Sequence, residues 1–359
     1  MTKLKLFFCT TLFVMFFQSA SYADDLEDAW DASGCRNDMS SNCDGACTRN
    51  GSGAILLNSD GGPTDAGSSK IRDNCNETPD FYRLTFYKAG LCKQSPISAL
   101  TATNPTDQCY EMLNIPTGRQ LTLQNTSAGV ITDKPLVAEP MQFEPGEYRY
   151  AYAVISNALQ IKHTESYSAA VEGYTAGGDR SSGVACWTNT NVTTYNNATA
   201  SMRGGLEPVN FGDDGNAGLG NTCGALADAN PQFATELIEN MHDDHDNGGL
   251  NAINTNWRAW DSTSFQSFND GAFSDLSMAK LLQSDNFTTA TGLANAHRIF
   301  YVVQFSNPLV FTEDSTQFEM SFNLSGSVSV DFASDGSFDG QLIAVKNGAD
   351  PFQVIFTVR

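Results

Sequence analysis

The sequence is poor in positive charge. Its 359 residues include 20 Lys and Arg against 41 Asp and Glu, which gives a formal net charge of −21 at pH 7. The basic residues are scattered singly, so the chain offers no basic patch to a phosphate backbone. The same charge repels anionic lipid headgroups. The composition therefore excludes nucleic acid as an expected partner and favours a protein that is soluble outside the cell.

Recognisable catalytic motifs are also missing. The chain has no Gly-x-Ser-x-Gly elbow, no Walker loop and no His-Glu-x-x-His motif. The glycines in the segment 215–220 have the wrong spacing for a dinucleotide-binding loop, and no strand-like run precedes them. An acid pair for glycoside hydrolysis stays open, because two carboxylates need only meet in space and 41 acidic residues are present.

Long apolar runs are absent except at the amino end. Lys3 and Lys5 precede the apolar run 6–17, and the small residues Ser21 and Ala23 follow it. This order is typical of a secretory signal peptide, and we expect cleavage after Ala23. No later run is long enough to cross a bilayer, so we expect no membrane insertion after the signal is removed. The predicted location is secreted, cell-surface or periplasmic.

Nine cysteines are present, of which Cys9 belongs to the signal peptide. The even number that remains indicates disulfides in an exported chain. Cys92 and Cys109 flank a polar loop between strand-like runs, which predicts a local pair. Cys186 and Cys223 bracket a Gly/Asn-rich segment and form the next expected pair. The other four are expected to pair among themselves, with zinc as the alternative: Cys35, Cys43, Cys47 and Cys75.

Alternation of apolar and polar residues predicts strands in two parts of the chain. The clearest case is 147–154, where Tyr148, Tyr150, Tyr152 and Val154 share one face. Further alternating or apolar runs occur at 81–87, 120–124, 158–163, 299–305, 318–324, 328–332, 342–346 and 352–358. We expect the last of these runs to be an interior or closing strand of the main sheet rather than a tail, because its apolar residues share one face.

These patterns predict a mainly β protein, an antiparallel β-sandwich of Greek-key or jelly-roll type. The expected divisions are a signal peptide (1–23), a Cys-rich, loop-dominated cap stapled by disulfides (24–80), a first β half (81–173), a long irregular, partly helical insertion (174–298) and a second β half (299–359). Within the insertion, Asn230-Pro231 predicts the start of a helix, and a weaker helix is expected over 276–283. The alternative is two small β units that flank the insertion.

A turn precedes the tyrosine-rich strand. The pattern Phe143-Glu-Pro145-Gly146-Glu-Tyr148 contains a proline and a glycine in the order that a tight turn requires. It resembles the corner found in many bacterial surface β-sandwich domains. The resemblance covers about twenty residues and implies a surface protein, but no functional residues.

Two segments in the predicted insertion carry ligand-type side chains. His242 and His245 are three residues apart, which places them on one face of a helix, and Asp246 follows them. Such a cluster can bind a metal, or it can be the solvated end of a helix. Trp257 and Trp260 can form a platform for a sugar ring, or pack inward as the apolar face of a helix.

A third segment resembles the opening of a calcium loop. Asp335, Ser337 and Asp339 place oxygen side chains at alternate positions, and a glycine follows. The twelfth position is Lys346, where an EF-hand loop has glutamate. Calcium is the cofactor that this segment brings into question, and a polar hairpin turn explains the same residues.

The readable features favour an exported, non-catalytic β-sandwich protein that binds a surface, adheres or self-assembles. Its expected partner is a glycan, another surface protein or a second copy of itself. The alternatives are a secreted hydrolase that acts on polysaccharide and a calcium-dependent glycan-binding module.

Overall fold

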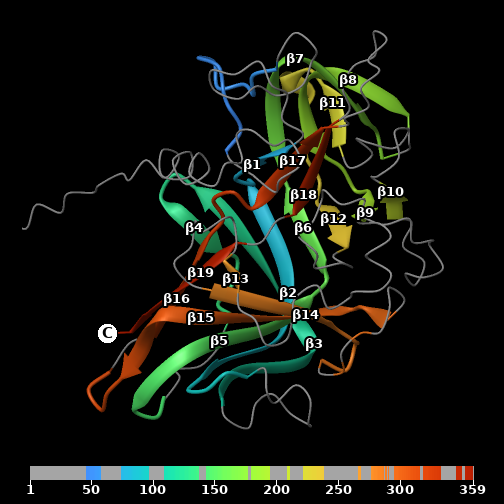
Figure 1. Ribbon diagram of the computed structural model, residues 1–359. Coiled ribbons are helices and arrows are strands. Elements are labelled where there is room, and N and C mark those ends of the chain that lie inside the picture. Colours follow the sequence, from blue (N-terminus) through green and yellow to red (C-terminus); the bar gives the residue numbers. More distant parts are fainter. Residues whose placement is uncertain are drawn as a thin grey trace, which may run out of the picture.

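The computed structural model describes residues 46–57, 74–96, 109–136, 143–176, 179–194, 208–210, 221–237, 266–267, 276–286, 288, 290, 295–315, 318–332, 345–349 and 352–358. The regular elements within them are β-strands, apart from one turn of 3-10 helix, η4 (Leu226–Asp228). The sheets are predominantly antiparallel, so the predicted mainly β class is confirmed (Figure 1). No helix in these described stretches is long and apolar enough to span a membrane.

The largest sheet is organised around the long strand β2. Its strands are β2 (Phe81–Cys92), β3 (Cys109–Thr126), β4 (Gly129–Thr132), β5 (Gly146–Ser156), β6 (Ala158–Lys162), β9 (Val192–Thr194), β10 (Pro208–Asn210), β12 (Ala234–Leu237), β13 (Gln266–Ser267), β14 (Leu276–Leu282) and β15 (Arg298–Phe311). β3 pairs with one side of β2, whereas β6 and β5 pair in succession with its other side. Asn157 separates β5 from β6, and its side-chain amide donates to the Ala296 carbonyl at 3.0 Å. Beyond this residue the sheet divides, with β12, β9 and β10 outside β6, and β15, β14 and β13 outside β5 (Figure 1).

Strand β5 begins at the predicted turn. Gly146 has a φ of 145°, which residues with a side chain rarely adopt, so glycine permits the chain to turn here. The Tyr148 hydroxyl donates to the Glu144 carbonyl at 3.1 Å, the hydrogen bond of a tyrosine corner. Tyr148 also packs edge to face on Phe311, with the ring centroids 5.2 Å apart. These contacts fix the angle at which β5 enters the sheet.

The row of tyrosines expected on one face of β5 serves two separate cores. Tyr148 belongs to the main core, whereas Tyr152 and Val154 belong to a second, smaller core formed with residues of β14 and β15. The pairing of β15 with β5 shifts register between Gln304 and Leu309, opposite the part of β5 that lies between the two cores. Both faces of this strand pair are therefore covered, which agrees with the continuous apolar run predicted at 299–305.

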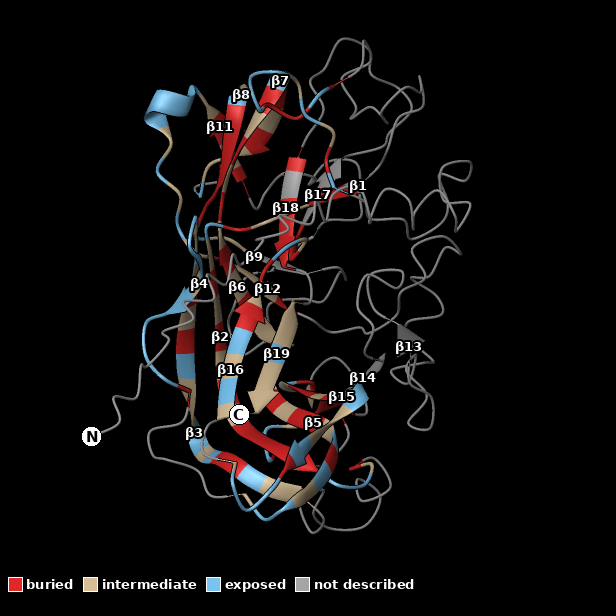
Figure 2. Ribbon diagram, turned by 90° about the vertical axis from the view of Figure 1, so that its left-hand side faces the viewer, coloured by how far each residue is buried: buried red, intermediate tan, exposed pale blue. Residues whose placement is uncertain are grey.

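Three smaller sheets complete the described fold. Their strands are β1 (Asn74–Glu77), β17 (Val328–Phe332) and β18 (Val345–Ala349); β7 (Thr164–Tyr174), β8 (Arg180–Thr188) and β11 (Asn221–Gly224); and β16 (Phe318–Asn323) and β19 (Gln353–Val358). All three sheets contribute apolar side chains to the main core, which also takes Tyr82, Leu84 and Phe86 from β2. Figure 2 shows buried stretches, in red, along β7, β8 and β18. The expectation that 352–358 closes the main sheet is wrong, because β19 pairs with β16 instead. Its apolar residues do pack on the main core, where Phe356 contacts the ring of Phe305.

The predicted helices are wrong wherever the structure describes their residues. The segment expected to follow Asn230 as a helix contains strand β12, which lies between β6 and β9. The segment 276–282 is strand β14, which pairs with β15 along its whole length. Short apolar runs do not distinguish a helix from a strand by their period, and here the hydrogen-bonding partner decides. The described part of the predicted insertion is consequently mostly strand, from β8 to β14.

Three disulfides join segments of the described chain. Cys92–Cys109 and Cys186–Cys223, the two pairs expected from their spacing, each connect residues that lie opposite one another in neighbouring strands. Cys47–Cys75 ties the segment 46–57 to β1. Cys35 and Cys43 lie outside the described residues. Three disulfides indicate an oxidising environment outside the cytoplasm.

Candidate functional site

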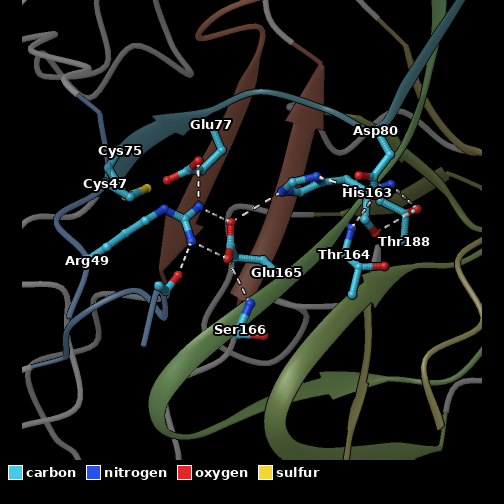
Figure 3. Close-up of polar contacts among 11 residues, drawn as sticks. Cys47, Arg49, Cys75, Glu77, Asp80, His163, Thr164, Glu165, Ser166 and Thr188 are labelled. Atoms are coloured by element: carbon cyan, nitrogen blue, oxygen red, sulfur yellow. Dashed lines mark hydrogen bonds and ion pairs between the residues drawn. A yellow bond between two sulfur atoms is a disulfide. The ribbon is translucent and has the colours of Figure 1, made fainter. Parts of the chain in front are cut away.

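Charged side chains from distant parts of the chain gather where the segment 46–57 meets β1 and β7 (Figure 3). We define the ionic cluster as Arg49, Glu77, Asp80, His163 and Glu165. Arg49 comes from the amino-terminal segment, Glu77 from β1 and Glu165 from β7. Asp80 precedes β2, and His163 stands between β6 and β7.

Backbone contacts hold the amino-terminal segment in place beside β7. The Ile55 N–H donates to the Ser166 carbonyl at 2.7 Å, and the Ser168 N–H donates to the Ile55 carbonyl at 2.8 Å. The side-chain oxygen of Asn50 accepts from the Ala54 N–H at 3.0 Å and so closes a tight turn. Arg49 and Ile55 consequently lie opposite each other in an antiparallel bridge, which places the guanidinium of Arg49 over β7.

Arg49 forms the centre of the ionic cluster. Its Nη1 donates to Glu165 Oε1 at 2.9 Å and its Nη2 donates to Glu165 Oε2 at 2.6 Å, a bidentate pair. The same Nη2 lies 2.6 Å from Glu77 Oε2, and Nη1 also donates to the Gly53 carbonyl at 2.5 Å. The side chains of Glu77 and Glu165 are 14% and 4% exposed, so both carboxylates are largely withdrawn from water.

The pKa values of Glu77 and Glu165 shift in opposite directions. Burial raises the pKa of Glu77 above its usual value, and the negative charge of Glu165 adds to this effect. Burial also acts to raise the pKa of Glu165, but the contacts with His163 and Arg49 outweigh it and leave that pKa lowered. Glu165 is therefore the carboxylate whose ionised form the fold stabilises.

His163 lies between two carboxylates. Its Nε2 is 3.5 Å from Glu165 Oε2, and its Nδ1 is 4.0 Å from Asp80 Oδ2. Neither ring nitrogen makes a hydrogen bond of regular geometry within the described part of the chain, although the side chain is buried. Asp80 Oδ2 accepts a hydrogen bond from the Thr164 N–H at 3.2 Å, which anchors the acid beside the start of β7.

The positions of the two glutamates argue against acid–base chemistry in this cluster. A retaining glycosidase holds its two carboxyl groups about 5–5.5 Å apart, with the scissile bond between them. Here one nitrogen of Arg49 lies 2.6 Å from an oxygen of Glu77 and from an oxygen of Glu165, so the guanidinium fills that space. The arrangement suits an ionic bridge that holds three segments together. Local sequence pattern does not predict this ionic bridge, since Arg49 and Glu165 are 116 positions apart.

The ligand-type residues predicted from the sequence all lie outside the described residues: His242, His245, Asp246, Trp257, Trp260, Asp335, Ser337 and Asp339. Calcium and metal binding by these segments stay predictions. Among the residues that are described, no group of three or more His, Cys, Asp or Glu side chains is placed to hold a metal ion.

Fold and cluster together define a disulfide-bonded, mainly β protein with a charged bridge inside it. No family model, no curated protein and no solved structure matches this chain.

Proposed function

We propose that this chain is an exported, non-catalytic β protein that binds a surface partner outside the cytoplasm, and that its ionic cluster is structural. The observation that carries the proposal is the position of Arg49, which occupies the space between Glu77 and Glu165. The three disulfides support an oxidising location. A fold that is held by disulfides and by a buried ionic cluster is suited to presenting a binding surface.

We also propose that the sheets β1–β17–β18 and β7–β8–β11 are the two layers of a small β-sandwich. Their apolar residues share the main core, including Val330 from one sheet and Val171 from the other. The Asn221 side-chain amide donates to the Val345 carbonyl at 3.1 Å, and the Glu236 carboxylate accepts from the Ala349 N–H. Both contacts are made to the backbone of β18, the edge strand of its sheet, and they occupy groups through which an edge strand could pair with another chain.

The test compares turnover with binding. The oxidised protein, without its predicted signal peptide, is incubated with a panel of polysaccharides and assayed for new reducing ends. The same polysaccharides are then cast into native gels to measure retention. We expect retention on at least one polysaccharide and no turnover on any.

Turnover by the wild type above a heat-denatured sample would contradict the proposal. Glu165→Gln then identifies the source, with Glu144→Gln as the matched control because the Glu144 side chain is 84% exposed. A loss of turnover in the first variant alone would place an acid–base pair in the ionic cluster.

A further inference from the structure

The main sheet carries a second group of charged side chains, on the face opposite the main core. Tyr82 and Leu84 point into the core, so Phe81, Arg83 and Thr85 lie on the other face of β2. The pairing of β3, β6 and β12 places their opposite residues on this same face. These residues are Gln120, Thr122 and Gln124 from β3, Gln160 and Lys162 from β6, and Thr235 from β12. We call this set, with Phe233, Tyr87 and Arg298, the outer face.

Cations and aromatic rings are stacked in pairs along the outer face. The guanidinium carbon of Arg83 lies 3.4 Å from the centroid of the Phe233 ring. Lys162 Nζ lies 5.3 Å from the centroid of Phe81, and the Phe81 and Phe233 centroids are 6.3 Å apart. These four side chains therefore form one continuous row, with a cation at each end.

A third pair lies at the far end of the outer face. The guanidinium carbon of Arg298 is 3.8 Å from the centroid of Tyr87. Gly118 makes room for this pair, because a Cβ at that position would come within 2.5 Å of Thr85 Cγ2 and 2.9 Å of the Tyr87 ring. Tyr87, two residues beyond Thr85 in β2, also packs against the second core.

Among the residues that the structure describes, no carboxylate lies within ion-pair distance of the three cations of the outer face, although the charge of Asp133 acts on Arg83 from farther away. Within the described residues, Arg83, Lys162 and Arg298 make no ion pair. The missing ion pairs do not reflect a shortage of acids, since the chain as a whole has a net charge of −21. All three side chains are partly open to solvent, so their charge is available to a ligand.

We propose that the outer face binds a glycan of mainly neutral sugars that carries isolated carboxylate groups. Partly exposed aromatic rings, such as those of Phe81 and Phe233, stack on the apolar faces of sugar rings. Gln and Thr side chains donate to and accept from hydroxyl groups. Arg and Lys supply charge-assisted hydrogen bonds to a carboxylate. A polyphosphate fits less well, because the net charge of the chain opposes a dense polyanion.

The test uses two probes that differ by one carboxylate: xylo-oligosaccharides with and without a single glucuronic acid branch. Affinities of the oxidised protein are measured by titration calorimetry at low and moderate salt. We expect the acidic probe to bind more tightly, with a preference that shrinks as salt increases. Arg83→Gln should weaken binding of the acidic probe by about tenfold and of the neutral probe by less than about twofold. Arg149→Gln, at an exposed site away from the outer face, should change neither.

Equal binding of the two probes, no binding of either, or an equal loss in Arg149→Gln would overturn the inference. So would tighter binding of a single-stranded oligonucleotide. The inference rests on the proposed non-catalytic function. The same titrations distinguish a failure of the proposed function from a failure of the glycan inference. Cleavage of either probe would reject the proposed function, whereas intact probes bound without regard to the carboxylate would reject only the glycan inference.

Discussion

The ionic cluster and the outer face treat positive charge in opposite ways. In the cluster, Arg49 contacts the buried carboxylate of Glu165 and the largely buried carboxylate of Glu77, which accept its hydrogen bonds inside the protein. On the outer face, Arg83 is stacked on the Phe233 ring, is partly exposed and makes no ion pair with a described residue. A buried ion pair holds a structure in one arrangement but is unavailable to ligands, whereas an exposed cation adds little stability and is free to bind. We therefore propose that the ionic cluster stabilises the fold and that the outer face binds a ligand.

The largest effect is expected from Arg49→Met. This change leaves Glu77 and Glu165 buried without their shared cation, and it should lower the free energy of unfolding by about 3–5 kcal/mol. The measurement is urea denaturation followed by circular dichroism at pH 7. Arg149→Met is the matched control, because its pair with Glu147 is exposed, and it should cost at most about 1 kcal/mol. Equal losses in the two variants would remove the distinction between the buried and exposed charges.

A smaller effect is expected from the two glutamates, whose contributions to the free energy of unfolding should depend on pH in opposite ways. Because the pKa of Glu165 is lowered, its ionised form adds stability above the unfolded-state value of about 4.3 and loses it as pH falls through the folded-state pKa. Because the pKa of Glu77 is raised, its contribution is present below the unfolded-state value and is lost as pH rises through the folded-state pKa. Glu165→Gln should therefore cost about 1–3 kcal/mol at pH 7, with a deficit that shrinks toward pH 3.

Glu77→Gln is the internal comparison for that experiment. At pH 7 it should cost less than Glu165→Gln, since the fold already favours the neutral form of Glu77. Melting temperatures of both variants and the wild type from pH 3 to pH 8 give the answer. If the two variants lose the same stability at every pH, the opposite roles assigned to the two acids are wrong.

The smallest effect on stability is expected on the outer face. Arg83→Gln removes a partly exposed cation–π contact with Phe233 and should change the free energy of unfolding by at most about 1 kcal/mol. The Arg83 Nε donates to Thr122 Oγ1 at 3.3 Å, a contact that glutamine can partly replace. Denaturation measured beside Arg49→Met checks this expectation. A loss as large as that of Arg49→Met would show that the outer face is structural as well.

Much of the strand content follows from local pattern. Alternation in β2 and β5 and the apolar run in β15 predict these strands, because one face or both faces must be covered. The Cys92–Cys109 and Cys186–Cys223 pairs also follow from local spacing. The same reasoning failed at β12 and β14, where short apolar runs fit a helix and a strand equally well.

The sequence by itself therefore determined the mainly β class, the pairs Cys92–Cys109 and Cys186–Cys223, and which residues share a face in the first part of β2. Only the tertiary structure decided which strands pair and which side chains are in contact. Alternation shows that the apolar face of β19 must be covered, but not that β16 rather than the main sheet pairs with it. In the same way, Glu165 is an acid at a buried strand position, and only the fold brings Arg49 to it from 116 residues away. Local sequence sets which way a side chain points, whereas its partner depends on long-range contacts that local periodicity does not encode.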